Sequence, residues 1–217
     1  EFALEKRDYK MIKLLLSHPK IDLQIISSIL LNAIQNGDMK TFQFVLSKVG
    51  IDINKKIINL FNILNENQII FNGISNKKFN DKTILGIVTD EGKIEFVKYL
   101  LSIPNIDVNA KQLVLIYLFT YKIYFPHIIY DLEVSPLHIA AERMNLGIFR
   151  LLLTHSNIDV NIKSNYYGIQ KNVFLINSIY IIHEISILHR AIEGGKYEIV
   201  ELLLSHPNID VNAKIIR

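Results

Sequence analysis

Histidines and aspartates that recur at regular spacing are the residues of this chain that could carry chemistry. His138 and His189 stand in similar surroundings, and a histidine can act as a general base because its ordinary pKa lies near neutral pH. No zinc-binding histidine pair, glycine-rich phosphate loop or activated-serine motif accompanies them. The other recurring residues are His18, His155 and His206, with Asp22, Asp52, Asp107, Asp159 and Asp210. Spaced by whole units, the histidines would lie too far apart to share a metal, and periodic acids are typical of turns and caps.

A block of constant length positions these residues. It runs 24 residues from an opening Ser or Thr to an Asp, in four places: Ser28–Asp52, Thr83–Asp107, Ser135–Asp159 and Ser186–Asp210. The steps from each Asp to the next opening residue differ, at 6, 31, 28 and 27 residues. A constant block with variable connections indicates a structural repeat joined by loops.

Each block predicts a short helix, a tight turn, a second helix and an extended tail. Ser135 can cap the first helix, and Pro136 suits its first turn, where no N–H is needed. Glycines then stand where a helix ends in a left-handed residue, at Gly37, Gly92 and Gly195. The second helix is apolar on more than one face, so neighbouring repeats must cover it.

The block resembles the ankyrin repeat. The family's opening T-P-L-H-x-A-A matches residues 135–141 (SPLHIAA) and, less fully, residues 186–191 (SILHRA). Its leucine-rich second helix and terminal D-V-N match residues 151–161 and 202–212. Gly86 and Leu31 replace the histidine, and Met144 replaces the turn glycine. In this family the histidine hydrogen-bonds the backbone and the opening Ser or Thr, so the resemblance gives His138 and His189 a structural role.

The resemblance implies an all-α solenoid of about five stacked helix pairs, forming a single array over residues 1–217. The repeats are expected at about 1–24, 25–54, 83–111, 135–163 and 186–214. The chain begins inside a repeat and stops at the start of a connector, so we expect a fragment of a longer array. Ser28 follows Asp22 by only six positions, which leaves no room for a projecting hairpin there.

Three long insertions interrupt the array, at about 55–82, 112–134 and 164–185. They are rich in Ile, Leu, Phe and Tyr, and each has two apolar runs around a polar break, at residues 65–67, 121–122 and 177–178. Such runs favour β-hairpins, which we expect to lie together and cover one another's apolar faces. Short helices packed into the groove of the array are an alternative, and AT-rich non-coding sequence read through as protein is another.

The resemblance also indicates where a protein partner would bind. The family uses its hairpin tips and the exposed ends of its inner helices. Those inner-helix positions are Gln35, Asn36, Asp90, Glu91, Glu142, Arg143 and Glu193 with Gly194, and tyrosines that the insertions could add are Tyr121, Tyr124, Tyr166 and Tyr180. The competing interpretation is that these are ordinary solvent-exposed helix ends.

Composition limits the remaining classes of function. The net charge of +3 comes from dispersed Lys and Arg, which argues against a nucleic-acid partner. The absence of cysteine excludes a disulfide scaffold and fits a reducing compartment such as the cytoplasm. The apolar run Leu113–Tyr121 is too short to span a bilayer, which argues against membrane contact. We therefore predict a non-catalytic protein-binding scaffold with no cofactor, metal or small-molecule substrate. The alternatives are a membrane-associated adaptor whose insertions contact lipid, and a regulatory array of a larger enzyme.

Overall fold

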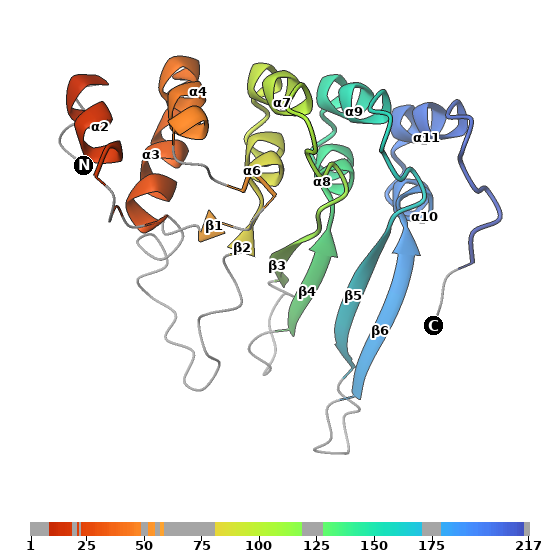
Figure 1. The fold of residues 1–217 in the computed structure, drawn as a ribbon. Helices are drawn as coiled ribbons and strands as arrows, with labels where there is room; N and C mark the ends of the chain where they lie inside the picture. Colours follow the sequence, from red (N-terminus) through yellow and green to blue (C-terminus); the bar gives the residue numbers. More distant parts are fainter. Residues whose placement is uncertain are drawn as a thin grey trace. The chain divides into compact units, whose positions relative to one another are not determined.

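The computed structural model divides the chain into two compact units, Glu1–Ile106 and Asp107–Arg217. It describes residues 9–18, 21, 23–48, 52–54, 57–58, 81–118, 128–170 and 179–214. In each unit helices pair into repeats, and antiparallel strands extend from the connections between repeats (Figure 1).

The first unit is built from helices that pack in pairs. Its elements are α2 (Tyr9–Leu16), α3 (Leu23–Gln35), α4 (Met39–Lys48), β1 (Ile57–Ile58), β2 (Asp81–Lys82), α6 (Ile84–Asp90) and α7 (Ile94–Leu101). Helix α3 packs against α4, and α6 packs against α7. Fully buried side chains include Leu30, Ile34, Phe42, Ile84, Leu85 and Leu100. Helix α2 is the second helix of the first predicted repeat, whose first helix falls outside the described residues, so the number of five repeats stays a prediction.

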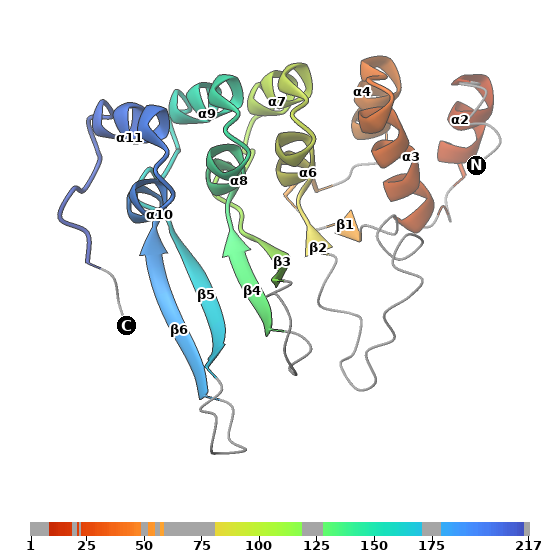
Figure 2. The same cartoon turned by 180° about the vertical axis from the view of Figure 1, so that it is seen from behind.

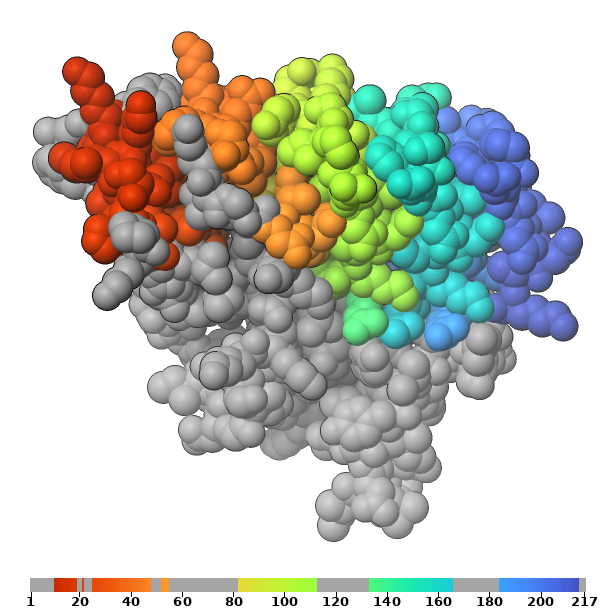
Figure 3. All heavy atoms as spheres, in the orientation of Figure 1, coloured from red at the N-terminus to blue at the C-terminus, as the bar shows by residue number. Residues whose placement is uncertain are grey.

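The second unit repeats one pattern twice: two strands, then two helices. Its elements are β3 (Gln112–Leu118), β4 (Ile128–Val134), α8 (Pro136–Glu142), α9 (Leu146–Leu153), β5 (Lys163–Gln170), β6 (Ile179–Ser186), α10 (Ile187–Glu193) and α11 (Tyr197–Leu204). Its core includes Leu137, Ile148, Phe149, Leu152, Ile199 and Leu203. In Figure 3 the atoms of α9 (teal) and α11 (blue) meet along a continuous surface, as expected of helices covered by their neighbours.

The turns between paired helices have the predicted left-handed residue. Gly37, Gly92 and Gly195 have φ of 68°, 66° and 62°. Met144 takes the same conformation with φ of 53°, although a side chain is disfavoured there. The next N–H closes the turn: that of Asn145 donates to the carbonyl of Ala140 at 3.0 Å. The backbone turn is therefore kept where the glycine is missing.

One predicted helix start is wrong. Ser28 lies inside α3, which begins at Leu23, and so it does not open a helix. The residues before Ser28 are mostly apolar and contain no proline, so the helix extends backwards through the short connection. The expected absence of a hairpin at this connection follows from the same extension.

The hairpin hypothesis is confirmed for the described parts of the insertions. Strands β3 and β4 pair antiparallel over seven residue pairs and β5 and β6 over eight. Figure 1 and Figure 2 show the two strands of each hairpin side by side. In the first insertion only β1 and β2 are described, and they also pair antiparallel. All three predicted polar breaks lie outside the described residues, as do Tyr121 and Tyr124.

The two hairpins of the second unit join into one sheet of order β3-β4-β5-β6. The junction is antiparallel and short: Asp131, Leu132 and Glu133 of β4 pair with residues 167, 166 and 165 of β5. The hairpins therefore lie together as predicted, and backbone pairing joins them close to the helices.

Candidate protein-interaction surface

The predicted binding residues stand at the C-terminal ends of the inner helices, in each unit separately. Gln35 and Asp90 end α3 and α6 in the first unit, and Glu142 and Glu193 end α8 and α10 in the second. The next residues are Asn36, Glu91, Arg143 and Gly194, and all four are exposed. Because the inner helices share one turn type, these ends occupy equivalent places in successive repeats.

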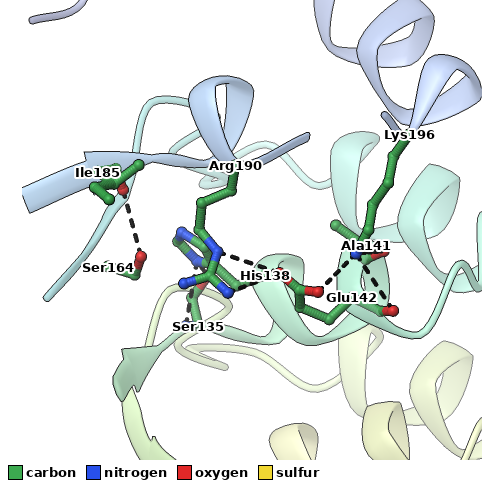
Figure 4. Close-up of polar contacts among 8 residues, drawn as sticks. All are labelled: Ser135, His138, Ala141, Glu142, Ser164, Ile185, Arg190 and Lys196. Carbon is green, nitrogen blue, oxygen red and sulfur yellow. Dashed lines mark hydrogen bonds and ion pairs between the residues drawn. The ribbon is translucent and has the colours of Figure 1, made fainter. Parts of the chain in front are cut away.

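Glu142 is held by the next repeat. Arg190 donates from its Nη2 to Glu142 Oε1 at 2.7 Å, and Lys196 donates from Nζ to Glu142 Oε2 at 2.6 Å. Lys196 also donates to the carbonyl of Ala141 at 3.2 Å. Figure 4 shows both basic side chains reaching from the α10/α11 pair to the end of α8. We name Glu142, Arg190 and Lys196 the Glu142 clamp.

The electrostatics of Glu142 agree with this geometry. Partial burial raises the pKa of its carboxyl, but the hydrogen bonds from Lys196 and Arg190 and their positive charges outweigh burial, so the net pKa lies below its ordinary value. The side chain of Glu142 is still 46% exposed, which limits the strength of the ion pairs through screening by water. The clamp therefore joins two repeats and leaves part of this carboxylate accessible.

His138 is a structural residue. It is only 1% exposed, and its Nδ1 lies 2.9 Å from the hydroxyl of Ser135 in a capping box at the start of α8. Burial, together with the positive charges of Arg190 and Lys111, lowers the pKa of His138 to about 3, so the ring is neutral at physiological pH. A neutral, buried ring that completes a helix cap is not available to substrate. The same bond, at 2.7 Å, joins His189 to Ser186.

Two of the other recurring histidines, His155 and His206, have a role that the sequence did not predict. Nδ1 of His155 accepts the backbone N–H of Asn157 at 3.2 Å, and Nδ1 of His206 accepts that of Asn208 at 3.2 Å. In the α6/α7 repeat Ile103 stands in place of the histidine and has no nitrogen that could accept this N–H. Asn105, the residue equivalent to Asn157 and Asn208, has a left-handed φ of 64°. The sequence signal for this role is a histidine followed two residues later by an asparagine, which occurs at 155/157 and again at 206/208.

The recurring aspartates and asparagines form a ladder along the repeats of each unit. The carboxylates of Asp107 and Asp159 each accept an N–H two residues on, at 3.0 Å. Asn109 then bridges to the next repeat, where its amide donates to the carbonyl of Asn157 at 2.8 Å and accepts the N–H of Asp159 at 2.9 Å. In the first unit Asn54 donates to the carbonyl of Asn105 at 2.8 Å. The described acids of this set are therefore turn residues, as predicted, and Asp22 lies outside the described residues.

Two predicted site residues of the first unit also take part in structural contacts. The carbonyl of Gln35 accepts a hydrogen bond from Nζ of Lys93 at 3.2 Å, and Asp90 lies 3.6 Å from Nζ of Lys82. The Asn36 amide donates back to Asn32 in the last part of α3. Much of the polar chemistry at the inner-helix ends thus serves contacts within the chain.

Glu91 and Glu193 differ from these residues. Both are exposed, and within the part of the chain that the structure describes their carboxylates form no ion pair. They occupy adjacent places in the repeat, one just after α6 and the other at the end of α10. They are the two predicted acidic residues most available to a partner.

An open hollow of about 770 Å³ lies on the outer helices of the first unit, between α4 and α7. Its lining includes Met39, Gln43, Lys93, Ile94, Phe96 and Tyr99. Below it Phe42 packs edge-on against Phe96, with ring centroids 4.9 Å apart, and against Tyr99 at 6.2 Å. This surface was not predicted, because its residues belong to two repeats.

Paired helices, left-handed turns and hydrogen bonds from repeat to repeat define a helical-repeat solenoid. The sequence profile of ankyrin repeats, in three copies, matches residues 2–164 and 113–215, and the chain belongs to the ankyrin repeat family. No curated protein matched in a sequence search. Among the described residues, no helix has both the length and the apolar character needed to cross a bilayer.

Proposed function

We propose that this chain is a non-catalytic scaffold that binds a protein partner through the inner-helix ends, with Glu91 and Glu193 as direct contacts. Ankyrin repeats generally mediate protein–protein interaction. The observation that carries the choice of residues is the exposure of these two carboxylates at adjacent places in the repeat, whereas the neighbouring Glu142 is held in the Glu142 clamp. The negative charge of these two carboxylates favours a partner surface that carries Lys or Arg.

The remaining predicted residues have supporting roles in this proposal. Arg143 is exposed beside Glu142, and Asn36 is exposed at the end of α3. Gln35, Asp90 and Glu142 set the position of the surface through contacts with Lys93, Lys82 and the next repeat. Replacement of these three residues would change packing and binding together, so they are poor probes of the surface.

The test compares two charge-reversal variants. Glu91→Arg combined with Glu193→Arg should abolish retention of partner proteins from the source cells, measured by affinity capture with quantitative mass spectrometry. The matched control is Glu198→Arg with Glu201→Arg, which reverses two exposed charges on the outer helix α11. Circular dichroism should show both variants folded. An unchanged set of retained proteins with the first variant would reject the inner-helix surface.

A further inference from the structure

We infer that the outer helices α4 and α7 bind a helix of a partner protein in the groove between them. The partner helix has an acidic residue in its first turn, an apolar face over Tyr99 and a basic residue in its last turn. The groove consists of the open hollow described above and a second hollow of about 430 Å³ farther along the same two helices. We name it the α4/α7 groove. None of the residues that line it belongs to the predicted binding residues at the inner-helix ends.

The two hollows follow one another along the first unit. Met39 and Gln43 of α4 line the first hollow, and Leu46 and Ser47, farther along α4, line the second. Tyr99 of α7 lines both, so the groove runs from the turns of the two repeats towards their extended tails. In both Figure 1 and Figure 2 α4 and α7 are neighbouring outer helices. The groove is therefore at least as long as α7, about 12 Å.

The floor of the groove is apolar. Ile94 is 36% exposed at the first hollow, where Phe96 lies buried beneath it, and Ile103 lines the second hollow. Covering apolar surface of this kind is favourable, and it supplies the affinity of most helix-in-groove complexes. Both repeats that form the groove lie within the chain, so its opening does not arise from the ends of the sequence.

Positive charge predominates at the end of the groove near the turns. Lys93, Lys98 and Glu95 line the first hollow. Glu95 accepts a hydrogen bond from Lys98 at 2.7 Å, but both side chains are exposed, so water weakens this pair. Lys93 donates to the carbonyl of Gln35 and forms no ion pair with a carboxylate of the described residues. A carboxylate of the partner would balance this charge.

The opposite end of the groove carries a carboxylate. Asp52 lines the second hollow and is exposed. Its Oδ1 accepts the backbone N–H of Asn54 at 3.1 Å, and a carboxylate has further lone pairs that can accept hydrogen bonds. A lysine or arginine of the partner matches this end. The groove thus requires an acid at one end of its occupant and a base at the other.

The walls of the groove favour a helix as its occupant. They are faces of two helices, whose backbone groups bond within each helix, so an extended segment would find no strand edge to pair with. A helix packs between such faces through apolar residues at positions i, i+3, i+4 and i+7. An acidic first turn and a basic last turn also suit the dipole of the partner helix itself. The charges therefore orient that helix in the same direction as α7.

Two synthetic peptides of about twelve residues, cross-linked so that they stay helical, test this proposal. Both have the same apolar face and the same composition. The first has Glu in its first turn and Arg in its last turn, and in the second these residues are exchanged. Fluorescence anisotropy should show the first peptide binding about fivefold more tightly, because its two ion pairs become repulsive contacts in the second.

Three variants locate the binding site. Ile94→Arg places a charge in the first hollow and should abolish binding, whereas Tyr197→Arg, at the equivalent place in α11, should not. Lys98→Glu leaves the floor intact and should remove most of the preference for the first peptide, which keeps the test decisive if Ile94→Arg does not fold. Glu193→Arg, at an inner-helix end, should leave peptide binding unchanged, so failure of the inner-helix surface and failure of the groove give different results.

Specific outcomes overturn the proposal. It fails if neither peptide binds, if both bind equally well, or if an Ile94→Arg protein that circular dichroism shows to be folded binds as wild type does. It also fails if analytical ultracentrifugation shows that the wild-type protein self-associates and the Ile94→Arg protein does not, since a second copy would then be the occupant.

Discussion

The α3/α4 and α6/α7 pairs of the first unit meet through different chemistry from the α8/α9 and α10/α11 pairs of the second. In the first unit the contact includes aromatic packing, with Phe42 against Phe96 and Tyr99. In the second unit α9 and α11 also pack together, and the contact includes the ion pairs of the Glu142 clamp. Both contacts join repeats of one design, so the repeat sets the geometry and leaves the chemistry of the junction free to vary.

This difference bears on how a binding surface is recognised in a repeat protein. A lysine after the turn reaches back to the preceding repeat in both units: Lys93 to the carbonyl of Gln35, and Lys196 to that of Ala141. Only in the second unit does that lysine also meet a carboxylate. A charged residue at an inner-helix end is therefore evidence of binding only when it is not used by the next repeat.

Loss of the aromatic contact should have the largest effect. Phe42→Ala removes a fully buried ring from the junction of the first unit, and we expect a loss of about 3–5 kcal/mol in the free energy of unfolding, measured by urea denaturation. Phe44→Ala is the control, since Phe44 lies on the same helix and is partly exposed. Equal losses in the two variants would show that the aromatic contact has no special weight.

The second unit should respond to pH through His138. The folded state keeps this ring neutral down to a pKa of about 3, whereas the unfolded chain binds a proton below about 6.5. Acid therefore destabilises the wild-type protein over this range, by about 2–3 kcal/mol between pH 6.5 and 4.5. His138→Leu, which places there the residue found at Leu31, removes this linkage.

The wild-type protein and His138→Leu should therefore reverse their order of stability between neutral pH and pH 4.5. Near pH 7 His138→Leu should be less stable by about 1–2 kcal/mol, because the buried hydroxyl of Ser135 loses its partner. Near pH 4.5 it should be the more stable protein. Chemical denaturation at a series of pH values measures the difference, and a constant difference over the whole range would mean that His138 titrates normally in the folded state.

Local features of the fold could be predicted from the sequence. The helix caps at Thr83 and Ser186, the left-handed turns and the hairpins depend on residues close together in the chain, and the repeated block shows them several times. The predicted start of α3 was wrong because the repeated block was aligned on Ser28, and no residue just before Ser28 stops the helix from starting earlier. A repeat alignment therefore finds helices better than it finds their ends.

Contacts between repeats could not be predicted in this way. Glu142 and Arg190 are 48 residues apart, and no local pattern links them. The sequence did predict the inner-helix ends as a set, by resemblance, but it could not separate Glu142, which the next repeat holds, from Glu193, which it leaves exposed. Distinguishing these two residues requires knowing how one repeat packs on the next.

A smaller effect should follow from removing the Glu142 carboxylate. Glu142→Gln should lose about 1 kcal/mol at neutral pH, the usual scale for partly exposed ion pairs. Since the pKa of Glu142 is lowered by folding, this stability is present above the ordinary pKa of a glutamate and is lost as the pH falls through the lowered value. The difference between the proteins should thus vanish in acid.

A double-mutant cycle with Lys196→Met tests whether the clamp is the cause. The two substitutions should be coupled in the second unit, whereas Lys93→Met in the first unit, where the lysine meets only a carbonyl, should cost less than Lys196→Met. Glu193→Gln is the matched control and should leave the free energy of unfolding within about 0.5 kcal/mol of wild type. If the losses in the free energy of unfolding from Glu142→Gln and Lys196→Met are additive, the two side chains do not stabilise each other, and the clamp does not explain the difference between the units.

The turn at Met144 offers the smallest change and the only expected gain. Met144 has a left-handed φ of 53°, at the place in the repeat where the α6/α7 and α10/α11 turns have Gly92 and Gly195. Met144→Gly relieves the steric cost of that conformation, although glycine also gains freedom in the unfolded chain, so the net gain should be about 0.5–1 kcal/mol. The reverse change, Gly195→Met, should destabilise the protein by a similar amount, because Gly195 has a φ of 62° and open space around its missing side chain. Thermal unfolding of both variants separates backbone strain from packing: if both substitutions destabilise the protein, the partly exposed Met144 side chain contributes contacts that outweigh the strain of its turn.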